Sequence, residues 1–125
     1  MITGVHQVVL SVQDQDRALH FWAEVIGFEL VKDEHLGDER WIELRPPSGN
    51  PVLVLSARSD RDTRSEVAEH LPHSNVFFTS DDIQQTHRDL AERRVLFPTP
   101  PTKMPWGWWA MFEDPEGTRF ALGQQ

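Results

Sequence analysis

The chain repeats one order of predicted elements, and this repeat is the feature that most constrains its fold. A strand, a helix and three further strands come first, and the same order returns after an offset of 68 residues. Identical residues also align along that offset: Val8 with Val76, Asp14 with Asp82, Ala23 with Ala91, and Glu24 with Glu92. A repeated element order with matched residues predicts a duplicated βαβββ module.

The first module is predicted from short runs of β-branched residues around one amphipathic segment. Asp14 or Asp16 is placed to cap a helix, Trp22 lies on its apolar stripe, and Gly27 suits its C-terminal end. A turn is expected in the proline- and glycine-containing stretch 45–51. The strands are expected over residues 5–12, 28–34, 40–45 and 51–56.

The second module follows the same pattern. A helix is predicted over 81–94, and 98–105 (PTPPTKMP) is expected to be an irregular loop. In the stretch 114–117 (DPEG), Pro115 and Gly117 stand where a tight hairpin turn prefers them. The strands are expected over residues 75–80, 95–98, 108–113 and 118–123.

The length of 125 residues indicates one domain. We expect it to consist of modules at about 1–58 and 72–125. A short helix within 62–72 should join them, because Thr63 and Glu66 have the spacing of a capping box.

Composition excludes several classes of function. The chain has no cysteine, so disulfide and thiolate chemistry are excluded. Twelve basic against twenty acidic residues give a net charge of −8, which disfavours nucleic acid and anionic membranes as partners. The N-terminus does not resemble a signal peptide, and no apolar run is long enough to span a membrane. We therefore expect a cytoplasmic protein.

Three stretches give the chain a resemblance to a known family. They are HQVVLSVQDQDRALHFWAEVIGFEL near the start, SNVFFTSDD in the middle and MFEDPEGTRFAL near the end. They resemble the vicinal oxygen chelate superfamily, which includes glyoxalase I, bleomycin-resistance proteins, glutathione-dependent fosfomycin-resistance enzymes and extradiol dioxygenases. The resemblance implies an α+β fold in which two βαβββ modules form a curved eight-stranded sheet with a cup-shaped cavity. It also implies a ligand in the cup and a homodimer.

The resemblance implies positions for a metal, because catalytic members hold a divalent cation in the cup. The matching positions here carry Gln7, Val54, Asn75 and Ala121. Two neutral amides and no carboxylate make a poor site for such a cation. We therefore expect no metal and no other cofactor, with one divalent metal as the alternative.

Two further observations bear on the metal positions. Shifting the first strand by one residue would make His6 the ligand, but His6 shares a face with the apolar Val8, Leu10 and Val12, so this register is disfavoured. A rescued site is conceivable if Glu43 and His73 join the two amides. Taken singly, Glu43 and His73 are typical surface or rim residues.

Three of the five tryptophans lie within residues 106–109. On a strand, Trp108 shares a face with Ala110 and Phe112, and Trp109 shares the opposite face with Met111. Three indoles left in water would make an unusually large apolar patch. They therefore either pack in a core or interface, or line the cup. The expected companions in a cup are Val9, Trp41, Val54 and Phe77.

Three functional readings remain open. The preferred one is a binding protein of the bleomycin-resistance kind, which holds a small aromatic or apolar organic molecule without a metal. The ligand-binding residues would be Gln7, Val9, Trp41, Glu43, Val54, Asn75, Phe77, Trp108, Trp109 and Ala121. The second is an enzyme, a lyase, isomerase or dioxygenase with an altered metal site or one that uses the cup without metal. The third is a partner-binding or purely structural homodimer.

Overall fold

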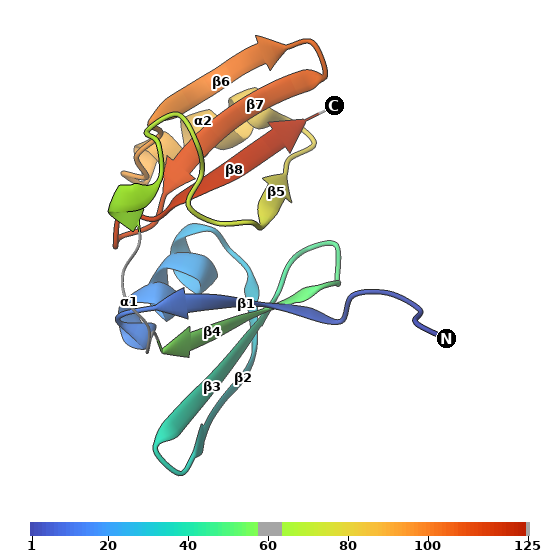
Figure 1. The fold of residues 1–125 in the computed structure, drawn as a ribbon, viewed down its shortest axis with the longest axis vertical. Coiled ribbons are helices and arrows are strands. Elements are labelled where there is room, and N and C mark those ends of the chain that lie inside the picture. Colours follow the sequence, from blue (N-terminus) through green and yellow to red (C-terminus); the bar gives the residue numbers. More distant parts are fainter. Residues whose placement is uncertain (58–63, 125) are drawn as a thin grey trace. The chain divides into compact units, whose positions relative to one another are not determined.

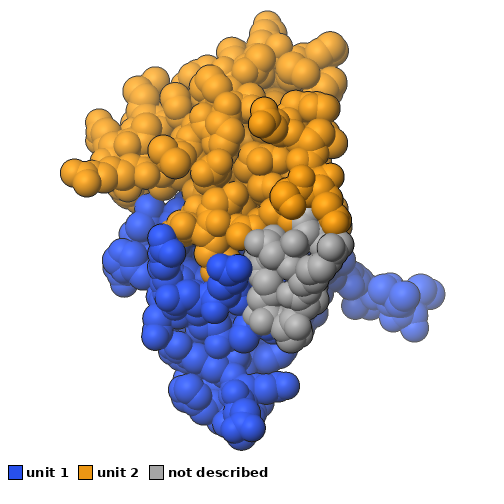
Figure 2. Space-filling model, turned by 60° about the vertical axis from the view of Figure 1, so that its left-hand side comes forward, with its two compact units in different colours: residues 1–60 blue, residues 61–125 orange. Residues whose placement is uncertain are grey.

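The computed structural model describes residues 1–57 and 64–124 and divides the chain into two compact units. Unit 1 runs from Met1 to Asp60 and unit 2 from Arg61 to Gln125; Figure 2 colours the two units separately. Each carries one four-stranded sheet, so the predicted eight strands and the α+β class are confirmed. No helix in the described part of the chain is long and apolar enough to cross a membrane.

Unit 1 has strand order β1-β4-β3-β2, with β1 parallel to β4 and the other neighbours antiparallel (Figure 1). The helical segment lies between β1 and β2 in the chain and contacts the sheet at β4. The elements are β1 (Gln7–Val12), α1 (Gln15–His20), the π-helical turn η1 (Phe21–Val25), β2 (Glu29–Leu36), β3 (Glu39–Arg45) and β4 (Val52–Ala57).

The helical segment of unit 1 begins and ends where its sequence predicts. The Asp14 side chain caps α1 by accepting a hydrogen bond from the Arg17 N–H at 3.1 Å. At the other end Gly27 has φ +95°, and its N–H donates to the Trp22 carbonyl. Trp22 is fully buried and meets the Phe21 ring edge-on at 5.2 Å. Phe21 and Trp22 thus place two aromatic side chains in the core of unit 1.

Unit 2 repeats the arrangement with strand order β5-β8-β7-β6 (Figure 1). Only β5 and β8 are parallel, and α2 contacts β6 and β8. The Asp82 side chain caps α2 by accepting from the Gln85 N–H at 3.1 Å. The elements are the 3-10 turn η2 (Arg64–Glu66), β5 (Phe77–Thr79), α2 (Ile83–Glu92), β6 (Thr99–Met104), β7 (Gly107–Glu113) and β8 (Arg119–Gln124).

The predicted hairpin between the last two strands is confirmed. The Gly117 N–H donates to the Asp114 carbonyl at 3.0 Å, and Gly117 has φ +83°, a conformation that glycine adopts without strain. The Asp114 side chain accepts from the N–H groups of Glu116 and Thr118. The turn therefore holds β7 and β8 in register.

The sixth strand is not where it was predicted. Residues 95–98 form no strand, and Thr99–Met104 within the expected loop forms β6 instead. Its two prolines disfavoured a strand in the sequence, because proline has no N–H to donate. However, β6 lies at the edge of its sheet and pairs only with β7, so Pro100 and Pro101 are tolerated there.

The short helix predicted within 62–72 is confirmed only as one 3-10 turn in its described part. Thr63 lies outside the described residues, and beyond it only the single turn Arg64–Glu66 is helical. Ala68 and Leu71 are exposed. A segment this short has too little apolar burial to stabilise a helix.

Candidate functional site

In unit 1 the side chains of β1 alternate between a buried face and a more exposed face, as predicted for the first strand. Leu10 and Val12 are buried, whereas Val9 is 52% exposed and Gln7 is half-buried on the other face. His6 precedes the strand and is exposed. Gln7 and Val9 therefore lie on the face of β1 opposite to the buried Leu10 and Val12.

The same face of unit 1 carries three more of the predicted ligand residues. Val9, Val54 and Glu43 are direct partners across β1, β4 and β3, so their side chains project to one side. Trp41 lies two residues from Glu43, and its Nε1 donates to Glu43 Oε2 at 2.6 Å. Lys32 Nζ is 3.9 Å from the same oxygen. The Glu43 carboxylate is thus engaged within its own unit.

In unit 2 the corresponding face combines aromatic and very small residues. Phe77 on β5 is the partner of Ala121 on β8, and Thr79 is the partner of Gly123. Trp109 on β7 is the other partner of Gly123. The rings of Phe77 and Trp109 meet edge to face, with centroids 5.8 Å apart and an interplanar angle of 71°. Their contact brings together two residues that the sequence analysis placed in a binding wall.

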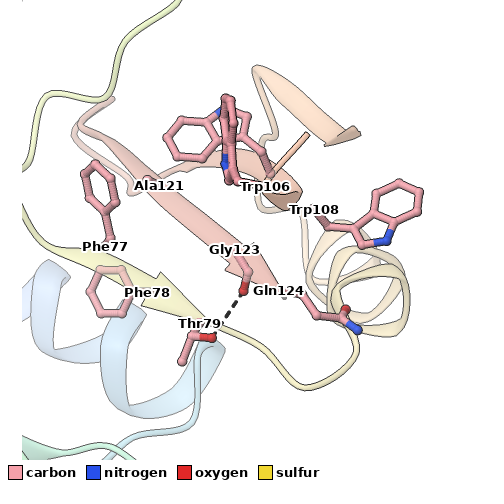
Figure 3. Close-up of a pocket in the computed structure, with 9 residues that line it drawn as sticks. Phe77, Phe78, Thr79, Trp106, Trp108, Ala121, Gly123 and Gln124 are labelled. Carbon is pink, nitrogen blue, oxygen red and sulfur yellow. Dashed lines mark hydrogen bonds between the residues drawn. The ribbon is translucent and has the colours of Figure 1, made fainter. Parts of the chain in front are cut away.

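A hollow of about 450 Å³ lies at this part of unit 2 (Figure 3). Trp106 and Phe77 at its rim are 64% and 63% exposed. No lysine, arginine, histidine, aspartate or glutamate of the described residues lines it. The lining residues are Phe77, Phe78, Thr79, Trp106, Trp108, Trp109, Ala121, Gly123 and Gln124.

The two neighbouring tryptophans of β7 point to opposite faces of the sheet. Trp109 shares its face with Ala121 through the pair Met111–Ala121, whereas Trp108 lies on the face of Ala110 and Phe112. Ala110 and Phe112 are buried, and the Phe112 ring stacks on Phe120 at 5.6 Å. In Figure 3 the Trp108 indole lies well apart from Phe77. Trp109 is therefore the indole of β7 that faces Phe77.

The two remaining polar candidates lie just before β5. Asn75 is exposed, two residues before Phe77. His73 Nδ1 accepts a hydrogen bond from the Arg119 N–H at 2.7 Å, and the His73 N–H donates to the Arg119 carbonyl at 3.0 Å. His73 therefore fastens this segment to the start of β8, and its Nδ1 lone pair is occupied.

The residues at the family's metal positions do not fit a divalent cation. Val54 is fully buried and Ala121 is 1% exposed, and neither side chain has a donor atom. Gln7 and Asn75 offer only neutral amide oxygens. Over residues 1–57 and 64–124, no three histidine, cysteine, aspartate or glutamate side chains gather as a metal site would require.

One buried carboxylate lies in unit 2 outside the hollow. Asp114, in the β7–β8 turn, is 7% exposed. Burial raises the pKa of Asp114 to about 6, and the nearby Glu116 charge adds to this, whereas hydrogen bonds from Thr118 and Glu116 and the Arg64 charge oppose it. Asp114 therefore loses its proton near neutral pH, at the end of a hairpin that lines the hollow.

The predicted ligand-binding residues did not include five residues that line the hollow: Phe78, Thr79, Trp106, Gly123 and Gln124. A signal for Gly123 was present, because the last strand alternates Ala121 and Gly123 on one face, where strands normally place larger residues. Trp106 precedes β7, so strand alternation did not predict its direction.

A family model for the glyoxalase/bleomycin resistance protein/dioxygenase superfamily matches residues 4–122. The chain belongs to this superfamily. Among sequence relatives, YurT from Bacillus subtilis (strain 168) is 33% identical over 122 residues, which is 93% of this chain and 94% of the relative.

Two solved structures of superfamily-like proteins are similar over almost their whole length. TnmS3, an antibiotic binding protein from Streptomyces sp. CB03234, is 30% identical with a TM-score of 0.80, covering 98% of this chain and 96% of its own. A superfamily member from Sphaerobacter thermophilus DSM 20745 is 29% identical with a TM-score of 0.81, covering 99% and 98%. These likenesses confirm the fold expected from the resemblance.

Proposed function

We propose that this superfamily member binds and holds a small aromatic or apolar organic molecule without converting it. The observation that carries the proposal is the hollow of unit 2, which has aromatic walls and, over residues 1–57 and 64–124, no charged lining side chain. A volume of about 450 Å³ falls in the range of sites for drug-sized ligands. The similar structure TnmS3, an antibiotic binding protein, supports a role in binding a small organic molecule.

The chemistry of the metal positions favours binding over catalysis. Charge buried in an apolar site needs anionic or strongly polar compensation, which Gln7, Val54, Asn75 and Ala121 do not supply. Glu43, the carboxylate considered for a rescued site, is held by Trp41 and lies 3.9 Å from Lys32. The proposal therefore includes no resident metal. It also includes a homodimer, since exposed apolar residues outside the hollow such as Leu30, Val31 and Leu36 gain from being covered. The proposed location is the cytoplasm.

The binding proposal is tested with N-phenyl-1-naphthylamine, a neutral aromatic probe whose emission rises in apolar sites. We expect saturable binding with one site per chain. The exposed apolar residue Leu96 does not line the hollow, so Leu96→Ala serves as the control and should bind normally. A titration without saturation up to the probe's solubility limit would contradict the proposal.

The metal part is tested separately by elemental analysis of untreated protein. We expect less than one tenth of a metal ion per chain, whichever divalent metal is supplied during expression. Asn75→His alone and combined with Ala121→Glu should raise the affinity for nickel or zinc. About one metal per chain that is lost in Gln7→Ala would instead support a metal-dependent lyase, isomerase or dioxygenase.

A further inference from the structure

Gly123 is an unusual residue at its position in the sheet. It lies in β8, which is flanked by β5 and β7, and its partners are Thr79 and Trp109. Glycine inside a strand weakens it, because the unfolded chain loses more conformational freedom and no side chain packs on the neighbours. A glycine at such a place commonly marks the close approach of another backbone or of a ligand.

Neither backbone conformation nor crowding requires glycine at position 123. Gly123 is not among the residues with positive φ, so an L side chain fits its backbone. A Cβ built on it would meet only the Trp108 carbonyl oxygen, at 3.5 Å, which is an ordinary contact. Within the described residues, the direction in which a side chain would grow is therefore open.

The other small residue on this face of β8, Ala121, is more deeply buried than Gly123. Ala121 is 1% exposed, and its β5 partner Phe77 contacts the Trp109 ring. Gly123, two residues further along β8, remains partly exposed and lines the hollow. The contacting rings of Phe77 and Trp109 thus form one wall of the hollow, and the backbone at Gly123 forms part of its floor.

We propose that Gly123 is the specificity-determining residue of the site, and that one ring of a flat, fused-ring aromatic ligand lies over its backbone against Trp109. A ring there takes the volume that a side chain would otherwise fill. Among the described residues no charged side chain lines the hollow, which favours an uncharged ring system. This inference rests on the proposed function and adds to it the shape of the ligand and the residue that admits it.

The experiment compares acridine, which has three fused rings, with quinoline, which has two, at pH 8 where both are neutral. Affinities are measured by displacement of N-phenyl-1-naphthylamine. We expect the wild type to bind acridine about tenfold more tightly, because the third ring buries further apolar area. Gly123→Ala should weaken acridine about fivefold and Gly123→Val more than fiftyfold. Quinoline, which is short enough to avoid position 123, should change less than threefold in Gly123→Ala.

Thermal unfolding supplies a second measurement, which distinguishes a glycine that admits the ligand from a glycine that is needed only for the fold. Alanine lowers the conformational entropy of the unfolded chain and suits an extended backbone, so Gly123→Ala should raise Tm while it weakens acridine. The matched control is Gly4→Ala, at an exposed glycine whose Cβ would meet nothing within 4 Å; its acridine affinity should stay at the wild-type value.

The outcomes separate the two levels of the proposal. If the wild type binds neither acridine nor quinoline nor the naphthylamine, the proposed function and this inference both fail. If the wild type binds acridine and folded Gly123→Ala and Gly123→Val bind it equally well, the binding function stands and the role of Gly123 is overturned. Equal weakening of quinoline and acridine would likewise overturn the assigned position of the ring.

Discussion

The two sheets place a tryptophan at the same position and give it different neighbours. Trp41 on β3 and Trp109 on β7 are separated by the repeat offset of 68 residues. Two residues further along each strand stand Glu43 and Met111. Trp41 donates its indole N–H to Glu43, whereas Met111 offers no comparable acceptor and Trp109 meets the Phe77 ring instead.

The residues paired between the edge strand and the next strand also differ between the two units. In unit 1 the partners of Val9 and Ser11 on β4 are Val54 and Ser56. In unit 2 the partners of Phe77 and Thr79 on β8 are Ala121 and Gly123. Unit 1 therefore carries residues of equal size on its edge strand and on the next strand, whereas unit 2 carries larger residues on the edge strand β5 and very small ones on β8. A duplicated fold sets where each side chain points, and the size of the residue one strand away decides whether space for a ligand remains.

The largest expected effect concerns the helix residues that anchor each core. Trp22 and Leu90 are separated by the repeat offset, and both are buried. We expect Trp22→Ala to lower the free energy of unfolding by about 3–5 kcal/mol and Leu90→Ala by about 2–3 kcal/mol, from lost burial and the remaining cavity. Urea unfolding followed by circular dichroism measures both. A larger loss of unfolding free energy in Leu90→Ala than in Trp22→Ala would contradict the expected order.

The next largest effect concerns the turns at 46–49 and 114–117, which occupy equivalent positions in the two units. The Gly49 N–H donates to the Pro46 carbonyl at 2.9 Å, as Gly117 does to Asp114 at 3.0 Å. Only the second turn begins with an ionisable residue. Asp114→Asn keeps a side-chain oxygen for both backbone N–H groups and removes the buried charge. We expect it to stabilise the protein at pH 8 by roughly 1–3 kcal/mol.

The pH dependence of that effect has a definite sign. The pKa of Asp114 is raised from 3.8 to about 6 on folding, so the folded chain holds this proton more tightly than the unfolded chain. The contribution of the protonated group is fully present below pH 3.8 and is lost as the pH rises through about 6. The advantage of Asp114→Asn should therefore be near zero at pH 3.8 and grow up to pH 7. Melting curves at several pH values that show a constant advantage would contradict the assignment.

The third effect tests the two tryptophans directly. We expect Trp109→Leu to weaken binding of acridine about tenfold, because the ligand loses aromatic contact as well as area. Trp41→Leu should leave the acridine affinity unchanged, since Trp41 does not line the hollow of unit 2. Displacement titrations measure both variants, together with Trp108→Leu, whose indole lies on the opposite face of the sheet but also lines the hollow. Unchanged affinity in Trp109→Leu would assign that residue to packing alone.

Much of the fold followed from the sequence, because periodicity and helix caps act locally. Asp14 begins one helix and Gly27 ends it as expected, and Asp82 caps the other helix at the equivalent position of the repeat. The strand Thr99–Met104 did not follow, because its prolines are acceptable only at a sheet edge, and position in the sheet is not a local property.

The candidate site was predictable to a similar degree. Alternation on β7 separated Trp108 from Trp109, and the contact of Trp109 with Phe77 then follows from the pairing of β7 and β5 with β8. The hollow at Gly123 was not predicted, since an empty volume depends on what the neighbouring strands leave unfilled. The use of Glu43 by Trp41 was also missed, although Nε1 and a carboxylate two residues away on one strand face are within reach.

The smallest expected effect tests whether the equivalent helix caps of the two modules contribute equally to stability. Asp14 and Asp82 stand at equivalent helix starts, and each accepts from a backbone N–H three residues ahead at 3.1 Å. Asp14→Ala and Asp82→Ala should each lower the free energy of unfolding by about 1 kcal/mol. The matched controls Asp14→Asn and Asp82→Asn keep the acceptor and lose only the charge near the helix dipole, so they should cost a few tenths of a kcal/mol. Urea unfolding of the four variants decides the matter. An alanine variant that matches the wild type at one helix would show that this cap is dispensable there, and that the two modules have diverged in energy while keeping the same geometry.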